Sequence, residues 1–89
     1  MKTEQLNASH LIVSIKDTKS GVFFTPTICR SKADFIRSVQ IEAKNPNSML
    51  HKFPADYDLY VVGKWCEYNA VDTIIDDRLG SVLDLCPLS

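Results

Sequence analysis

The segment Asp58–Trp65 constrains the fold of this chain more than any other stretch. Its aromatic and β-branched residues favour a strand, in which successive side chains point to opposite faces of a sheet. One face is apolar and is expected to pack on the core: Leu59, Val61 and Trp65. The other face carries Tyr60, Val62 and Lys64. A strand is not stable alone, so the chain must supply further strands.

Two segments nearer the N-terminus are predicted to form a β-hairpin. Leu11–Lys16 and Val22–Thr25 have strand composition, and the turn Asp17–Gly21 offers Gly21 for a positive φ. Pro26 has no amide hydrogen. The second strand should therefore end there or lie at the edge of the sheet.

A helix is expected from about Lys32 to Lys44. Ser31 is a good N-cap, and the Asp34 carboxylate can reach back to the Ser31 amide as in a capping box. Asn45-Pro46 should end the helix, because the residue before proline is pushed out of the helical region. The stripe expected to face the sheet consists of Phe35, Ile36, Val39, Gln40 and Ala43.

The order of these elements predicts the fold class. Val71–Ile75 is expected to be a fourth strand, which Asp76–Gly80 then breaks. The order β-β-α-β-β predicts an α+β domain, with an antiparallel sheet of about four strands and one helix packed on one face. The other sheet face would stay open, which favours a homodimer.

The length of 89 residues allows one domain and is too short for two. Residues 1–9 are polar and are expected to form a flexible N-terminus. We expect residues 10–76 to form the α+β domain and residues 77–89 to form a C-terminal tail. The tail holds the apolar run 82–88, which either docks on the domain or binds a partner.

The charge is unevenly distributed along the chain, although the net charge is only −1. Residues 1–53 carry eight Lys or Arg against four Asp or Glu, and residues 54–89 carry two against seven. These balances of +4 and −5 give the net value. The asymmetry fits a basic binding surface beside an acidic tail, or two halves that attract each other within one chain or across a dimer.

The cysteines and histidines do not predict a metal site. Cys29, Cys66 and Cys86 are widely spaced, and neither His10 nor His51 lies near one of them in sequence. Structural zinc usually needs close ligand pairs. An odd number of cysteines favours reduced thiols in a reducing compartment. With no apolar run of membrane-spanning length and no apolar N-terminal signal, we expect a cytoplasmic protein that does not bind membranes.

The sequence does not predict an enzyme or a cofactor. No Ser/His/Asp or Cys/His arrangement follows from the spacing, and the three glycines cannot form a phosphate-binding loop. The carboxylate pairs Asp56/Asp58 and Asp76/Asp77 could attract Mg²⁺, but acidic turns are far more common than metal sites.

The segment from Ala33 to Lys64 resembles a known family. The stretches Asn45-Pro46-Asn47-Ser48-Met49-Leu50 and Lys52-Phe53-Pro54-Ala55-Asp56-Tyr57-Asp58-Leu59-Tyr60, followed by Gly63, are similar to the small nonstructural protein of gokushovirus-type single-stranded DNA phages (Microviridae). After Gly63 the chain departs from the family, which usually has an acidic turn with a glycine there. Much of the motif also has a structural explanation, since Asn45-Pro46 ends a helix and Ser48 caps the next turn.

The resemblance implies a phage protein that is made in the host cytoplasm during infection and is absent from the virion. It further implies DNA binding and a role in the switch from double-stranded to single-stranded genome synthesis.

Single-strand binders combine cations for the phosphates with aromatic rings for the bases, and this chain can provide both on one surface. The candidate residues on the outer sheet face are Lys16, Phe23, Tyr60 and Lys64. Those near the start of the helix are Arg30, Lys32 and Arg37. The alternative for Phe23 and Tyr60 is a place in the core or in a dimer interface.

A third possibility is a protein-interaction module with no nucleic-acid activity. An edge strand near Pro26 or Ile74-Ile75 could pair with a second copy, a host protein or a viral protein. Exposure of Tyr60 and Phe23 beside lysines favours DNA. Burial of the same rings by a second subunit favours the interaction module.

Overall fold

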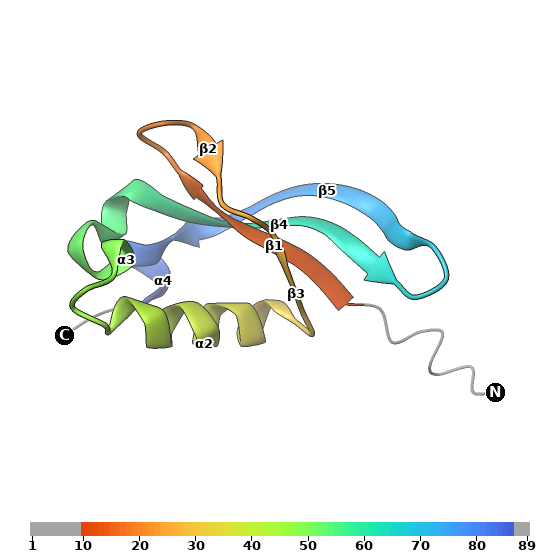
Figure 1. Cartoon of the computed structure of the whole chain (residues 1–89), viewed down its shortest axis with the longest axis horizontal. Helices are drawn as coiled ribbons and strands as arrows, with labels where there is room; N and C mark the ends of the chain where they lie inside the picture. The colour runs from red at the N-terminus through yellow and green to blue at the C-terminus, as the bar shows by residue number, and fades with distance from the viewer. Residues whose placement is uncertain (1–9, 87–89) are drawn as a thin grey trace.

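A computed structural model describes residues 10–86 of the chain (Figure 1). It confirms the predicted class, an α+β fold with an antiparallel sheet and a helix packed on it. Residues 1–9 of the predicted flexible N-terminus, and residues 87–89 of the predicted tail, lie outside this range. The strands are β1 His10–Asp17, β2 Val22–Phe23, β3 Thr27–Cys29, β4 Tyr57–Cys66 and β5 Ala70–Ser81. The helices are α2 Lys32–Ala43, α3 Met49–Lys52, the 3-10 helix η1 Pro54–Asp56 and α4 Val82–Leu85.

The sheet has five strands in the order β2-β1-β4-β5, and β3 also pairs with β1. The sequence predicted about four, because it gave the second strand of the hairpin as Val22–Thr25 and assigned no strand to Thr27–Cys29. That strand is instead divided around Pro26: β2 pairs with one end of β1, and β3 pairs with the other end. The turn before β2 contains Gly21, whose φ of +77° is in the left-handed region, as expected.

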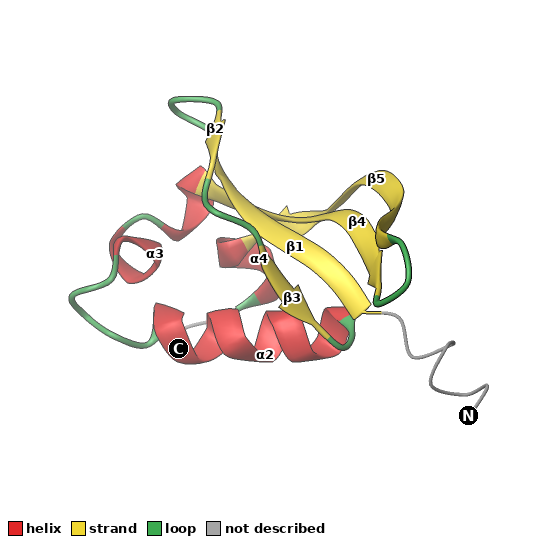
Figure 2. Cartoon of the chain, turned by 45° about the vertical axis from the view of Figure 1, so that its right-hand side comes forward, coloured by secondary structure: helices red, strands yellow, loops and turns green. Residues whose placement is uncertain are grey.

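All helices of the described residues lie on one face of the sheet, and the opposite face has no helix over it (Figures 1 and 2). The core lies between the sheet and α2 and closes at one end on α3 and α4. Its buried apolar residues are Val13, Phe35, Val39, Ala43, Leu50, Tyr57, Leu59, Val61, Val82 and Cys86. None of the helices in residues 10–86 is long and apolar enough to cross a membrane.

Helix α2 begins and ends close to the predicted positions. The Ser31 hydroxyl accepts a hydrogen bond from the backbone N–H of Asp34 at 3.1 Å, which satisfies one of the free amides of the first turn. The helix ends at Ala43, one residue before the predicted end and just ahead of Asn45-Pro46. Of the predicted stripe, Phe35, Val39 and Ala43 are buried.

Substitution of Ser31 by alanine is expected to lower the free energy of unfolding by about 1 kcal/mol, because the Asp34 amide loses its cap. Denaturant unfolding measures the change. Ser38→Ala is the matched control: the Ser38 hydroxyl donates to the Asp34 carbonyl at 3.0 Å inside the helix, where alanine is the better helix former. Equal losses in the two variants would contradict the capping role.

The predicted break at Asp76–Gly80 is wrong, because β5 continues through this segment to Ser81. Pairing with β4 holds the strand, and the Arg78 guanidinium binds the Asp58 carboxylate of β4. After Ser81, which caps α4 through the Asp84 amide, the chain turns back under the sheet. Val82 and Cys86 are buried in the core, so the described part of the predicted tail is docked on the domain.

A β-bulge at Val62 reverses the faces of the end of β4. Pairing with β1 proceeds from Val13–Val61 directly to Ile12–Gly63, so Val62 has no partner in β1. An extra residue shifts the alternation of every later side chain by one position. Trp65 therefore lies on the face opposite to the core, with 37% of its surface exposed, and the prediction that it packs with Leu59 and Val61 is wrong.

Candidate nucleic-acid interface

Three of the predicted residues meet on the open face of the sheet. Lys16 and Phe23 are direct cross-strand partners in the β1–β2 hairpin, and Tyr60 lies on the adjacent strand β4. The rings of Phe23 and Tyr60 meet edge to face, with centroids 5.1 Å apart and planes at 79°. The Lys16 ammonium lies 5.5 Å from the Phe23 centroid and 6.0 Å from the Tyr60 centroid. We call these three residues the Lys16 cluster.

The Lys16 cluster joins one positive charge to two rings that remain in contact with solvent. Phe23 is 43% exposed, and Tyr60 is half-buried. Lys16 is half-buried, and a cation over an aromatic ring contributes about 0.5–1 kcal/mol at an exposed site and about 2 kcal/mol where it is desolvated, which favours this arrangement. The Lys16 cluster therefore combines two features of single-strand binders: a positive charge for phosphate and ring surface for bases.

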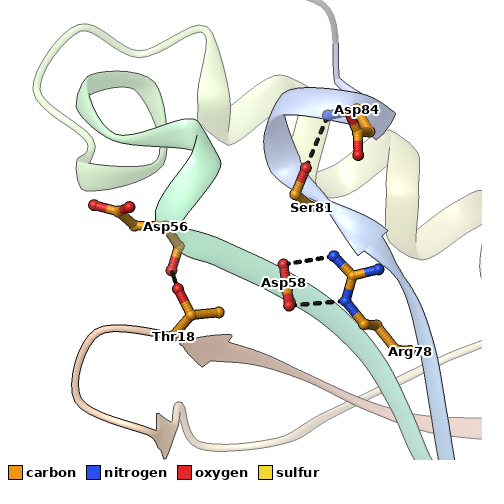
Figure 3. Close-up of polar contacts among 6 residues, drawn as sticks. All are labelled: Thr18, Asp56, Asp58, Arg78, Ser81 and Asp84. Carbon is orange, nitrogen blue, oxygen red and sulfur yellow. Dashed lines mark hydrogen bonds and ion pairs between the residues drawn. The ribbon is translucent and has the colours of Figure 1, made fainter.

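The hairpin that carries Phe23 is held in place by polar contacts at both of its ends. The Ser14 hydroxyl of β1 donates to the Phe24 carbonyl at 2.7 Å. At the turn, the amide and the hydroxyl of Thr18 both donate to the Asp56 carbonyl of η1 at 2.9 Å; Figure 3 draws the hydroxyl contact. These contacts fix Phe23 against Tyr60 rather than leaving it on a free loop.

Arg78 is a further cation on this face. It is the cross-strand partner of Tyr60 and makes a bidentate ion pair with Asp58, at 2.8 Å from Nε and 3.2 Å from Nη2 (Figure 3). The hydrogen bonds and the charge of Asp58 raise the pKa of the Arg78 guanidinium above its usual value, so it stays charged. Its side chain is 51% exposed and keeps access to solvent.

Sequence reasoning missed Arg78 because it assigned Asp76–Gly80 to a break in the strand. The spacing of Ile75 and Leu79 indicates a strand that continues through this segment. A strand places both on one face and Arg78 on the other. Both pack against the core in the structure.

The other predicted cations do not join the Lys16 cluster. Lys64 pairs with Leu11 and Thr73 after the bulge, which turns its side chain to the helix side of the sheet, so its predicted place beside Tyr60 is wrong. Lys32 is bound to Asp77 at 3.0 Å on that same side. The remaining two are exposed at the start of α2 and on its outer surface: Arg30 and Arg37.

Residues 10–77 match the family model described as Phage ORF5 protein. The chain belongs to the Phage ORF5 protein family. This confirms, at the level of the family, that the resemblance pointed to a phage protein. No curated protein and no solved structure matches the chain.

The match places the Lys16 cluster inside the Phage ORF5 region, which runs from the first residue of β1 to Asp77 in β5. Arg78 lies one residue beyond it. Helix α4 likewise lies after the matched residues in the sequence of this Phage ORF5 family member.

The three cysteines and His51 of this Phage ORF5 family member are not part of the Lys16 cluster. All three cysteines are free thiols, and burial raises the pKa of the Cys29 and Cys86 thiols, which keeps them protonated. The His51 ring lies 2.8 Å from the Ala43 carbonyl at the end of α2. Within residues 10–86 there is no pocket and no group of three potential metal ligands.

Proposed function

We propose that this phage protein binds single-stranded DNA through the open face of its sheet. Lys16 and Arg78 would bind phosphates, and Phe23 and Tyr60 would stack on bases. The observation that supports the proposal is the Lys16 cluster, which joins two partly exposed rings and a lysine on the face that no helix of the described residues covers.

The biological setting of the proposal follows the resemblance to gokushovirus-type Microviridae. The protein would act in the host cytoplasm and support the switch to single-stranded genome synthesis. It would act by binding and not as an enzyme. In keeping with this, His51 is engaged with the end of a helix and the buried thiols stay protonated.

The expected affinity is weak and depends on salt. Stacking of a base on an aromatic side chain contributes about 1–3 kcal/mol. A free cation that neutralises a phosphate gives a slope of log K against log salt of roughly −0.7, which Lys16 supplies, whereas Arg78 adds less because its charge is already paired with Asp58. The small net charge of −1 adds no long-range attraction. The proposed complex is therefore sequence-tolerant and held by a few contacts.

The first test is fluorescence anisotropy of a labelled single-stranded oligonucleotide titrated with protein. Tyr60→Ala is expected to weaken binding about 5-fold to 150-fold, because a stacking platform of about 1–3 kcal/mol is removed. Tyr68→Ala is the matched control, since Tyr68 is 67% exposed at the β4–β5 turn, away from the Lys16 cluster. Equal losses in the two variants would contradict the proposed surface.

The same titration at several salt concentrations tests the cations. Lys16→Ala should reduce the salt slope by about 0.7, whereas Lys64→Ala, on the opposite face, should leave it unchanged. Absence of wild-type binding at roughly 100 µM protein in low salt, the weak end of non-specific binding, would rule out the proposal.

A second candidate function, a protein-interaction module, is favoured by exposed apolar side chains on the edge strand β5. Ile74 is 85% exposed and Val71 is 53% exposed. A second copy of the chain, or a host or viral protein, could cover them. If the anisotropy titration shows no binding, this candidate is tested next by sedimentation of the purified protein and by pull-down.

A further inference from the structure

The bulge at Val62 places the side chain of Trp65 on the same face as the Lys16 cluster. Tyr60 is opposite Ser14 before the bulge, and Trp65 is opposite His10 after it. Strand β1 has regular alternation between these two pairs, so Ser14 and His10 point to one face. Bulges often re-aim a side chain beside a functional site. Here the shift gives the open face a third aromatic ring.

The surface between Tyr60 and Trp65 is apolar. Ile12 is paired with Gly63, and a Cβ at Gly63 would lie 3.3 Å from Cδ1 of Ile12 and 2.9 Å from the Thr73 carbonyl. The isoleucine side chain therefore lies over the bare backbone of the glycine. On this face of β1 and β4, no charged side chain therefore lies between Tyr60 and Trp65.

The charges on this face favour a path for nucleic acid along β1 and β4. The outward residues of β1 include no carboxylate: His10, Ile12, Ser14 and Lys16. Asp58, on β4, is 8% exposed and already bound to Arg78. By contrast, alternation from Ile74 to Arg78 puts Asp76 on the outer side of β5, where it would repel phosphate.

We propose that Trp65 is a second base-stacking platform, and that single-stranded DNA runs along β4 from Trp65 to the Lys16 cluster. This rests on the proposed function and extends it by naming the course and the length of the bound strand. Because Val62 is bulged, Tyr60 and Trp65 lie opposite Ser14 and His10, which are four residues apart on β1, or about 13 Å at the usual rise. A stacked strand advances about 3.4 Å per nucleotide. The two platforms would therefore be bridged by roughly four stacked nucleotides, or by fewer if the strand is extended.

The chain contains a single tryptophan beside three tyrosines, so emission excited at the red edge of the absorption band, where tyrosine does not absorb, reports on Trp65 alone. Titration of the wild-type protein with an unlabelled oligonucleotide of eight nucleotides is expected to quench the emission. A dinucleotide, which is too short to bridge both platforms, should give less than half of that quenching at equal occupancy, as judged by displacement of a labelled probe.

Variants at Trp65 test the length dependence directly. Trp65→Leu should weaken binding of the eight-nucleotide strand about 5-fold or more, and Trp65→Phe should restore part of the affinity, because a smaller ring still stacks. Binding of the dinucleotide should change less than 2-fold. Unchanged unfolding midpoints confirm that both variants are folded, as expected for a side chain outside the core.

The outcomes separate this inference from the proposed function. If anisotropy shows binding while the emission and the Trp65→Leu affinity stay unchanged, the proposed function stands and the second platform is overturned. If anisotropy shows no binding, both fail. If the emission instead changes with protein concentration and sedimentation gives twice the mass, Trp65 lies in an interface between two copies, and the inference is overturned.

Discussion

Replacement of Leu59 by alanine is expected to lower the free energy of unfolding by about 2–5 kcal/mol. Leu59 has no exposed surface and lies on β4, the central strand, among Val13, Val61 and the apolar side of α2. Removal of its side chain loses buried apolar contacts and leaves a cavity that a close-packed core fills only in part. A domain of this size has a total stability of roughly 5–15 kcal/mol, so the variant loses a large part of it.

Urea unfolding followed by circular dichroism measures this effect as a shift of the midpoint at constant slope. Leu83→Ala is the control, because Leu83 carries the same side chain with 54% of its surface exposed on α4. The control should change the stability by less than about 0.5 kcal/mol. A loss below 1 kcal/mol for Leu59→Ala would mean that β4 is not the centre of the core.

The second large effect is expected for Val82→Asp, which introduces a carboxylate into the core where α4 docks. Val82 has no exposed surface, and it follows Ser81 at the start of the helix. An uncompensated buried charge destabilises by about 3–5 kcal/mol. Leu83→Asp puts the same group at the adjacent exposed position and should be nearly neutral. If α4 were not docked in solution, the two variants would behave alike.

The destabilisation by Val82→Asp should also depend on pH. Burial raises the pKa of a carboxyl group above about 3.9, so the folded state holds the proton to higher pH than the unfolded state does. The free energy of unfolding therefore falls as pH rises above that value. Relative to Leu83→Asp, the loss should be smaller near pH 4 than at pH 7. A loss independent of pH would contradict burial of the carboxylate.

Local sequence signals predicted the limits of α2 and the position of the hairpin turn. Ser31 and Asn45-Pro46 set the ends of α2 because capping and the restriction before proline act within a few residues. Gly21 marked the hairpin turn for the same kind of reason. Lys16, Phe23 and Tyr60 were predicted to lie together, and the structure does bring them together, since strand alternation holds over each short stretch before the bulge.

The sequence by itself determined the fold class, the limits of α2 to within one residue, and the shared face of Lys16, Phe23 and Tyr60, because these depend on local propensity and on alternation. Tertiary structure alone decided the faces of Lys64 and Trp65, the continuation of β5 to Arg78, and the docking of α4. A bulge arises where two paired strands differ in length between fixed contacts, so it is a property of the pairing and not of one strand. Likewise, Arg78 is held in the sheet by contacts with β4, where it pairs with Tyr60 and binds the Asp58 carboxylate.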